Sequence, residues 1–252
     1  MSNFEWGFGR LLGELTPEHK SLLQKFSRIK GKDPSVSLLL DYLTVTEEEK
    51  QVKEADVLFI KGNKLAIGGQ YEEAIECYKK AVDIKEDSHE AWNNMGTAYS
   101  DLGQYKEAIE NYKKAVDIKK DSHEAWYNMG NAYSKLGQYE EAIESYKKAV
   151  DIKKDKHEAW YNMGTAYREI EDIKNALTSH QEAVKYLSDD SLYWYQLAVD
   201  WQMEGNVNET AKSLKVCFAL KPEFREIFKS DERFNMKREE VEKIISSQQT
   251  KS

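Results

Sequence analysis

The chain of 252 residues has little of what several protein classes depend on. It contains only two cysteines, Cys77 and Cys217, which fall at small apolar positions, so we expect buried thiols and no disulfide framework. No apolar run approaches the roughly 20 residues that a membrane span needs, and the N-terminus lacks the pattern of a secretory signal. These absences predict a soluble protein and, by default, a cytoplasmic one.

A basic excess is absent too. Charged residues make up 33% of the chain, and its formal charge at pH 7 is -8. Proteins that bind nucleic acid normally present a concentrated basic face, so this balance argues against nucleic acid as a partner. It favours a protein partner that is neutral to basic.

What the sequence does contain is a repeated unit. Residues 91–124 and the next 34 residues, 125–158, differ at only six positions, and sliding this frame along the chain finds five copies. Each copy has a large apolar residue followed four positions later by a small one, as in Trp126 and Gly130. A 34-residue period with helical spacing predicts an all-α fold, in which helix-turn-helix units bury their apolar faces against neighbouring copies.

Glycine and acidic residues mark the ends of the expected helices. A glycine recurs between the two helices of a unit because it tolerates the positive φ of many helix ends, but Glu171 stands at this position in the fourth unit. The other members are Gly69, Gly103, Gly137 and Gly205. Asp87, Asp121 and Asp155 each precede a glutamate by three residues, which predicts helix starts with an aspartate variant of the capping box.

This pattern divides the chain into three parts. Residues 1–54 have an apolar helical stripe but no repeat, and we expect a helical cap or a docking segment there. Residues 55–222 hold five repeats, at 55–88, 89–122, 123–156, 157–190 and 191–222. Residues 223–252 are expected to form capping helices and a frayed tail.

The run from Ala125 to Tyr133 closely resembles the consensus of the tetratricopeptide repeat (TPR) family, and the resemblance covers about two thirds of the chain. It implies a right-handed α-solenoid of about five helix-turn-helix repeats, whose first helices line a concave groove where peptides commonly bind. The proline that usually ends the family's repeat occurs only as Pro222. Its absence elsewhere predicts longer second helices.

A row of primary amides on the first helices is the main candidate site. Amides can pair with both N–H and C=O groups of an extended peptide, and the row is similar to the asparagine ladder of O-GlcNAc transferases. The alternative is that these amides only satisfy local backbone. Aromatic rings beside the row would add flat binding surface. The predicted groove residues are Asn63, Asn94, Asn128, Asn162, Gln196, Tyr127, Tyr161, Tyr195, Asn131 and Phe59, and Glu90, Glu124 and Glu158 form an acidic edge.

The sequence offers no constellation for catalysis, a metal or a cofactor. The pairs beginning at His89, His123 and His157 resemble the start of a zinc-protease motif, but the second histidine is missing each time. Some family members clamp a peptide carboxylate with cationic residues, and Glu124 stands in one of those places here, which makes chaperone-tail binding unfavourable. We therefore expect a non-enzymatic adaptor that binds a partner's extended segment. The alternatives are a self-assembling scaffold, which would form homo-oligomers, or a regulatory subunit of an enzyme complex.

Overall fold

The computed structural model describes residues 47–247, and every structural statement below refers to this part of the chain. It contains twelve α-helices and one 3-10 helix, without a β-strand. The chain divides into two units between Asp56 and Val57, and the following description concerns the second unit. The expectations for residues 1–46 and for the last five residues lie outside the described range.

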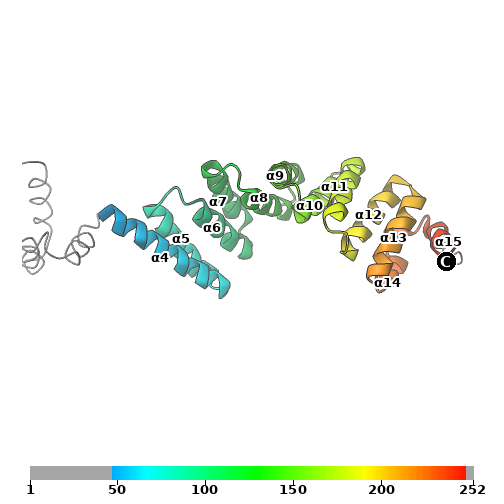
Figure 1. Cartoon of the computed structure of the whole chain (residues 1–252), viewed down its shortest axis with the longest axis horizontal. Helices are drawn as coiled ribbons and strands as arrows, with labels where there is room; N and C mark the ends of the chain where they lie inside the picture. The colour runs from blue at the N-terminus through cyan, green and yellow to red at the C-terminus, as the bar shows by residue number, and fades with distance from the viewer. Residues whose placement is uncertain (1–46, 248–252) are drawn as a thin grey trace, which may run out of the picture. The chain divides into compact units, whose positions relative to one another are not determined.

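Ten helices form five pairs joined by turns of two or three residues. The pairs are α4 (Glu47–Ile67) with α5 (Tyr71–Ile84), α6 (His89–Asp101) with α7 (Tyr105–Ile118), α8 (His123–Lys135) with α9 (Tyr139–Ile152), α10 (His157–Glu169) with α11 (Ile173–Tyr186), and α12 (Ser191–Glu204) with α13 (Val207–Leu220). From α6 to α13, each helix packs against the helices that precede and follow it along the chain (Figure 1). Helix α5 shares a buried apolar cluster with α4. The predicted all-α solenoid of helix-turn-helix repeats is confirmed.

Small residues let the two helices of a pair come close together. Alanines 74, 108, 142 and 176 on the second helices have no exposed surface. On the first helix of the third repeat, a Cβ atom added to Gly130 would lie only 2.6 Å from Cε1 of Tyr146, a fully buried ring on the second helix. The recurring glycine is therefore a requirement of packing, because any side chain would collide with the tyrosine.

The turns inside the pairs adopt the backbone conformation that the glycines predicted. Gly69, Gly103, Gly137 and Gly205 have φ between 72° and 83°. Glu171 has φ 62° at the corresponding turn and is the single non-glycine residue with positive φ in the described range. Its side chain makes this conformation costly, since Cβ crowds the backbone in the left-handed region.

We expect Glu171→Gly to raise the free energy of unfolding by about 1 kcal/mol, because the substitution relieves this backbone strain. Chemical denaturation followed by circular dichroism measures the change. The matched control is Gly137→Glu, which places the same side chain in the same turn one repeat earlier and should lower stability by a similar amount. A Glu171→Gly variant no more stable than the parent chain would contradict the strain argument.

The starts of the first helices differ from the prediction by one residue. The N-cap positions are Ser88, Ser122 and Lys156, not the preceding aspartates, and the Ser122 side chain accepts a hydrogen bond from the Ala125 amide. The glutamates thus follow the cap by two residues, which is too close for a capping box.

The expectation of longer second helices is wrong, since all five second helices, including the one followed by Pro222, have 14 residues. A tryptophan of the next repeat holds the loop where proline is missing. The indole Nε1 of Trp126 donates a hydrogen bond of 2.9 Å to the carbonyl oxygen of Lys120. The same bond joins Trp92 to Glu86, Trp160 to Lys154 and Trp194 to Ser188, at 2.8 Å each. These bonds use carbonyls at the position where the family usually has proline.

The C-terminal residues cover the last helix pair. Helix α14 (Phe224–Ser230), the 3-10 helix η1 (Glu232–Phe234) and α15 (Arg238–Ser247) share one buried apolar cluster with α12 and α13. Both cysteines are buried, as predicted, and burial raises the pKa of the Cys217 thiol to about 12. Between residues 47 and 247, none of the helices has the length and apolar character needed to cross a membrane.

Candidate peptide-binding groove

The predicted amides lie on the first helices, and those of the second, third and fourth repeats each bond to the repeat before. Nδ2 of Asn94 donates a hydrogen bond of 2.9 Å to Oδ1 of Asn63. Two repeats further on, Nδ2 of Asn162 donates an equally short bond, 2.9 Å, to Oδ1 of Asn131. These bonds go to side chains of the preceding repeat and not to local backbone, so the amides form a ladder along the array.

Buried tyrosines of the second helices hold the acceptor side of this ladder in place. The hydroxyl of Tyr78 donates to Oδ1 of Asn63, and the hydroxyl of Tyr146 donates to Oδ1 of Asn131, both over 2.8 Å. Burial raises the pKa of Tyr78 to about 12 and that of Tyr146 further still. The phenols therefore remain protonated donors at neutral pH, and they fix the amide orientation by occupying the oxygen.

Part of the ladder remains available to a ligand. Nδ2 of Asn128 donates a hydrogen bond of 3.3 Å to Oδ1 of Asn93. Nδ2 of Asn162 donates to Oδ1 of Asn131, as given above. The Oδ1 atoms of Asn128 and Asn162 accept no hydrogen bond from residues 47–247, and neither atom is buried without a partner. Both amides thus keep a carbonyl oxygen that can pair with a peptide backbone, and Asn128 also keeps one N–H, whereas both N–H groups of Asn162 are used.

Aromatic side chains continue the groove beside the ladder. Nδ2 of Asn162 also donates to the hydroxyl of Tyr127 over 3.3 Å, and Nζ of Lys156 lies 4.8 Å from the centroid of that ring. The ring of Tyr161 stacks on Tyr193 with a centroid distance of 4.5 Å and an interplanar angle of 13°. The repeat pattern did not predict Tyr193, because its position is alanine in the three preceding repeats; that departure was the available signal.

Tyr195 is a correction to the predicted groove. Its side chain is buried, its hydroxyl donates to Oδ2 of Asp231 over 2.7 Å, and its ring packs against Phe224 and Phe234. Burial alone would raise the pKa of Asp231, but hydrogen bonds from Arg233 and Tyr195 lower it to about 2. The C-terminal segment covers this position, and Gln196 beside it has a buried Oε1 without a protein partner in the described range.

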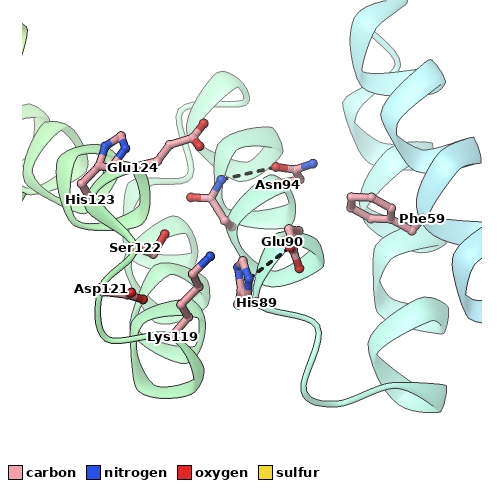
Figure 2. A pocket seen from close by; sticks show the side chains of 10 residues that line it. Phe59, His89, Glu90, Asn94, Lys119, Asp121, Ser122, His123 and Glu124 are labelled. Carbon is pink, nitrogen blue, oxygen red and sulfur yellow. Dashed lines mark hydrogen bonds and ion pairs between the residues drawn. The ribbon is translucent and has the colours of Figure 1, made fainter. Parts of the chain in front are cut away.

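Two cavities open on the first helices. The larger, of about 540 Å³, is lined by Ser100, Asn131, Ser134, Lys135, Tyr139, Tyr146, Asn162, Thr165, Ala166 and Glu169. The smaller, of about 350 Å³, is lined by Phe59, His89, Glu90, Asn93, Asn94, Lys119, Asp121, Ser122, His123 and Glu124 (Figure 2). Four of the predicted groove residues, Phe59, Asn94, Asn131 and Asn162, therefore border space that a ligand can enter.

A buried charged cluster lies where the fourth repeat meets the fifth. Asp200 on α12 has no exposed side-chain surface; its Oδ2 pairs with Nδ1 of the equally buried His180, and its Oδ1 accepts a bond of 3.0 Å from Nη1 of Arg168. Nε2 of His180 is buried without a partner in the described part of the chain. The sequence analysis did not predict this cluster, although His180, Arg168 and Asp200 each differ from the residue at the same position one repeat earlier.

The recurring histidines do not form a metal site. Nε2 of His89 lies 3.1 Å from Oε1 of Glu90. Nδ1 of His157 lies 3.1 Å from the hydroxyl oxygen of Tyr193. Among residues 47–247, no three histidine, cysteine, aspartate or glutamate side chains come together in a way that could hold a metal ion.

Comparison with known proteins agrees with this architecture. Several solved structures share the α-solenoid of paired helices. A structure of MamA is 21% identical with a TM-score of 0.64, covering 69% of this chain and 95% of that one. MamA 41-end from Desulfovibrio magneticus RS-1 is 21% identical with a TM-score of 0.63, covering 68% of this chain and 96% of its own. YrrB, described as a TPR protein with an unusual peptide-binding site, is 22% identical with a TM-score of 0.61, covering 70% of this chain and 90% of its own.

Family models make the assignment specific. The tetratricopeptide repeat model matches residues 87–155 and 121–189, and a TPR repeat model matches residues 62–103. Together the matches span residues 62–189, just over half of the chain. The protein belongs to the tetratricopeptide repeat family. No curated protein sequence matches the chain significantly.

Proposed function

We propose that the protein is a non-enzymatic adaptor that holds an extended segment of a partner protein along its first helices. The observation that carries this proposal is the amide ladder, in which Asn128 and Asn162 are fixed by bonds to the preceding repeat and keep their oxygen atoms free. An array of fixed amides suits a peptide backbone, because every residue of an extended segment offers the same N–H and C=O groups whatever its side chain.

Two further features support a peptide ligand. The cavities beside the ladder are open and lined mainly by polar side chains, unlike the largely apolar pockets that small molecules usually occupy. Tyr127 and Tyr161 add aromatic surface of the kind enriched in protein interfaces. YrrB, which shares the fold, is described as having a peptide-binding site. Its likeness supports the architecture, and the ladder of this chain supplies the argument for binding.

The proposal is tested with a display library of random dodecapeptides, selected on the full chain. We expect recovered peptides to bind the parent chain and to lose at least about tenfold in affinity, or about 1.4 kcal/mol, with the double variant Asn128→Ala, Asn162→Ala. Fluorescence polarisation with labelled peptides measures the dissociation constants. Asn208→Ala is the matched control, because Asn208 is an exposed asparagine on the second helix α13, away from the ladder.

Each outcome bears on the proposal. Affinity lost with the ladder variant and kept by the control supports backbone recognition by the amides. Peptides that bind the folded ladder variant as tightly as the parent chain would remove the ladder from the mechanism, and failure to recover any peptide would count against a peptide-binding groove. Circular dichroism of each variant confirms that it is folded.

A further inference from the structure

The smaller cavity lies beside a repeat position whose residue type changes from one repeat to the next. Asn93 lines it, and the same repeat position holds Tyr127 and Tyr161 in the next two repeats. The amide of Asn93 is much shorter than a tyrosine side chain. The short side chain at this position of the second repeat leaves open a space that is lined by residues of the first three repeats.

The walls of this cavity differ in chemistry from the rest of the groove. Carboxylates come from Glu90 on α6, Glu124 on α8 and Asp121 in the loop before α8, whereas Lys119 is the one lysine or arginine among the lining residues. With histidine counted as neutral, the formal charge of the lining is -2. Figure 2 shows Phe59 across from the loop that carries Asp121, as the single apolar side chain of the lining.

We propose that this cavity is a side-chain pocket of the groove and that it takes an arginine or lysine side chain of the bound segment. The inference rests on the proposed function, and it identifies the chemistry by which the adaptor selects its partner. A cationic head is attracted by three carboxylates, and its aliphatic stem can lie on the ring of Phe59. An acidic side chain would meet net negative charge, and a large apolar one would find only Phe59 as an apolar wall.

Further acceptors are placed around the cavity. Oδ1 of Asn93 already accepts from Asn128, and Oδ1 of Asn94 accepts from Asn93 over 3.3 Å, so both oxygens are held in fixed orientations. A carbonyl oxygen has a second lone pair for a ligand N–H. His123, another lining residue, has a buried Nδ1 without a partner in residues 47–247, which is a further acceptor in the neutral tautomer that carries its proton on Nε2.

The repeats themselves supply a test variant. In Asn93→Tyr the new side chain is the one already present at Tyr127, whose hydroxyl accepts from Asn162 over 3.3 Å. In the parent chain, the corresponding donor to position 93 is Asn128, and its Nδ2 donates to Oδ1 of Asn93 over the same distance, 3.3 Å. The substitution therefore fills the cavity and retains the ladder contact, so pocket and ladder can be tested separately.

The experiment repeats the dodecapeptide selection on the full chain and on Asn93→Tyr. We expect peptides selected on the parent chain to be enriched in arginine or lysine at one position, and this enrichment to disappear with Asn93→Tyr. For a selected peptide, replacing that cationic residue with glutamine should weaken binding to the parent chain about tenfold and leave binding to Asn93→Tyr unchanged. Glu124→Gln should also weaken binding, whereas Glu110→Gln, at an exposed carboxylate on the second helix α7 and outside the cavity, should not.

The outcomes separate the pocket from the groove. Peptides without a cationic preference, peptides enriched in acidic or aromatic residues, or an equal preference on the parent chain and Asn93→Tyr would overturn the pocket and leave the groove standing. Equal effects of Glu124→Gln and Glu110→Gln would also overturn it, because they would indicate a general electrostatic attraction. Selection of no peptide on the parent chain would overturn the proposed function and the pocket together.

Discussion

Replacing Asp200 with alanine is expected to destabilise the folded protein by about 3–5 kcal/mol, because the change leaves a buried histidine and a largely buried arginine without their shared carboxylate. Removing one partner of a buried charged cluster costs far more than the cluster contributes, since the remaining groups lose the partner that compensates for their desolvation. Chemical denaturation measures the loss of stability. A loss below about 1 kcal/mol would be typical of an exposed ion pair and would contradict the burial of this cluster.

The repeats provide a control for this prediction. At the corresponding positions, one repeat earlier, the residues are Tyr146, Ala166 and Ser134. The triple variant His180→Tyr, Asp200→Ala, Arg168→Ser therefore installs a neutral set that already packs where the third repeat meets the fourth, and there Ser134 Oγ lies 3.3 Å from the hydroxyl of Tyr146. We expect it to recover most of the stability lost by Asp200→Ala. A triple variant as unstable as the single variant would show that the cost comes from packing and not from unpaired charge.

Phe234→Ala is expected to destabilise the C-terminal part of the array by about 3–5 kcal/mol, because it removes a fully buried aromatic side chain from the last apolar cluster. The ring of Phe234 lies 4.9 Å from that of Phe228 and 5.9 Å from that of Tyr195. Since the stability of a repeat array depends on nearest neighbours, the loss should concentrate in α12 and α13.

Hydrogen exchange followed by mass spectrometry locates this effect. We expect faster exchange in α12 and α13 and little change in α6 to α9, while Met236→Ala, at a side chain that is 94% exposed, should leave all helices unchanged. Uniform loss of protection across every helix would show instead that the array unfolds as one cooperative unit.

Much of the fold could be predicted because the repeats constrain one another. The 34-residue period, the small residues at fixed repeat positions and the turn glycines all follow from packing rules that act within and between adjacent helices. The errors have local physical causes. The helix starts were placed one residue early because the cap is the residue after each aspartate, namely Ser88, Ser122 or Lys156. The second helices are not longer without proline, because tryptophans such as Trp126 hold the loop carbonyls.

The candidate site could be predicted less well where its residues contact residues outside the repeats. Asn94 and Asn162 could be placed on one row because the period aligns them, and their bonds to neighbouring repeats need only helix geometry. The burial of Tyr195 depends on Asp231, Phe224 and Phe234, which belong to no repeat, so the period could not reveal it.

The tryptophan bonds at the loops also bear on how the array can grow. Trp92, Trp126, Trp160 and Trp194 each close the loop that precedes their own helix, using a residue of the neighbouring repeat. Each of these junctions thus joins a tryptophan near the start of one repeat to a backbone carbonyl near the end of the preceding repeat. A duplicate of residues 125–158 inserted after Glu158 would meet near-identical surfaces on both sides. The array is therefore modular, and its length can change in whole repeats without a new type of contact between repeats.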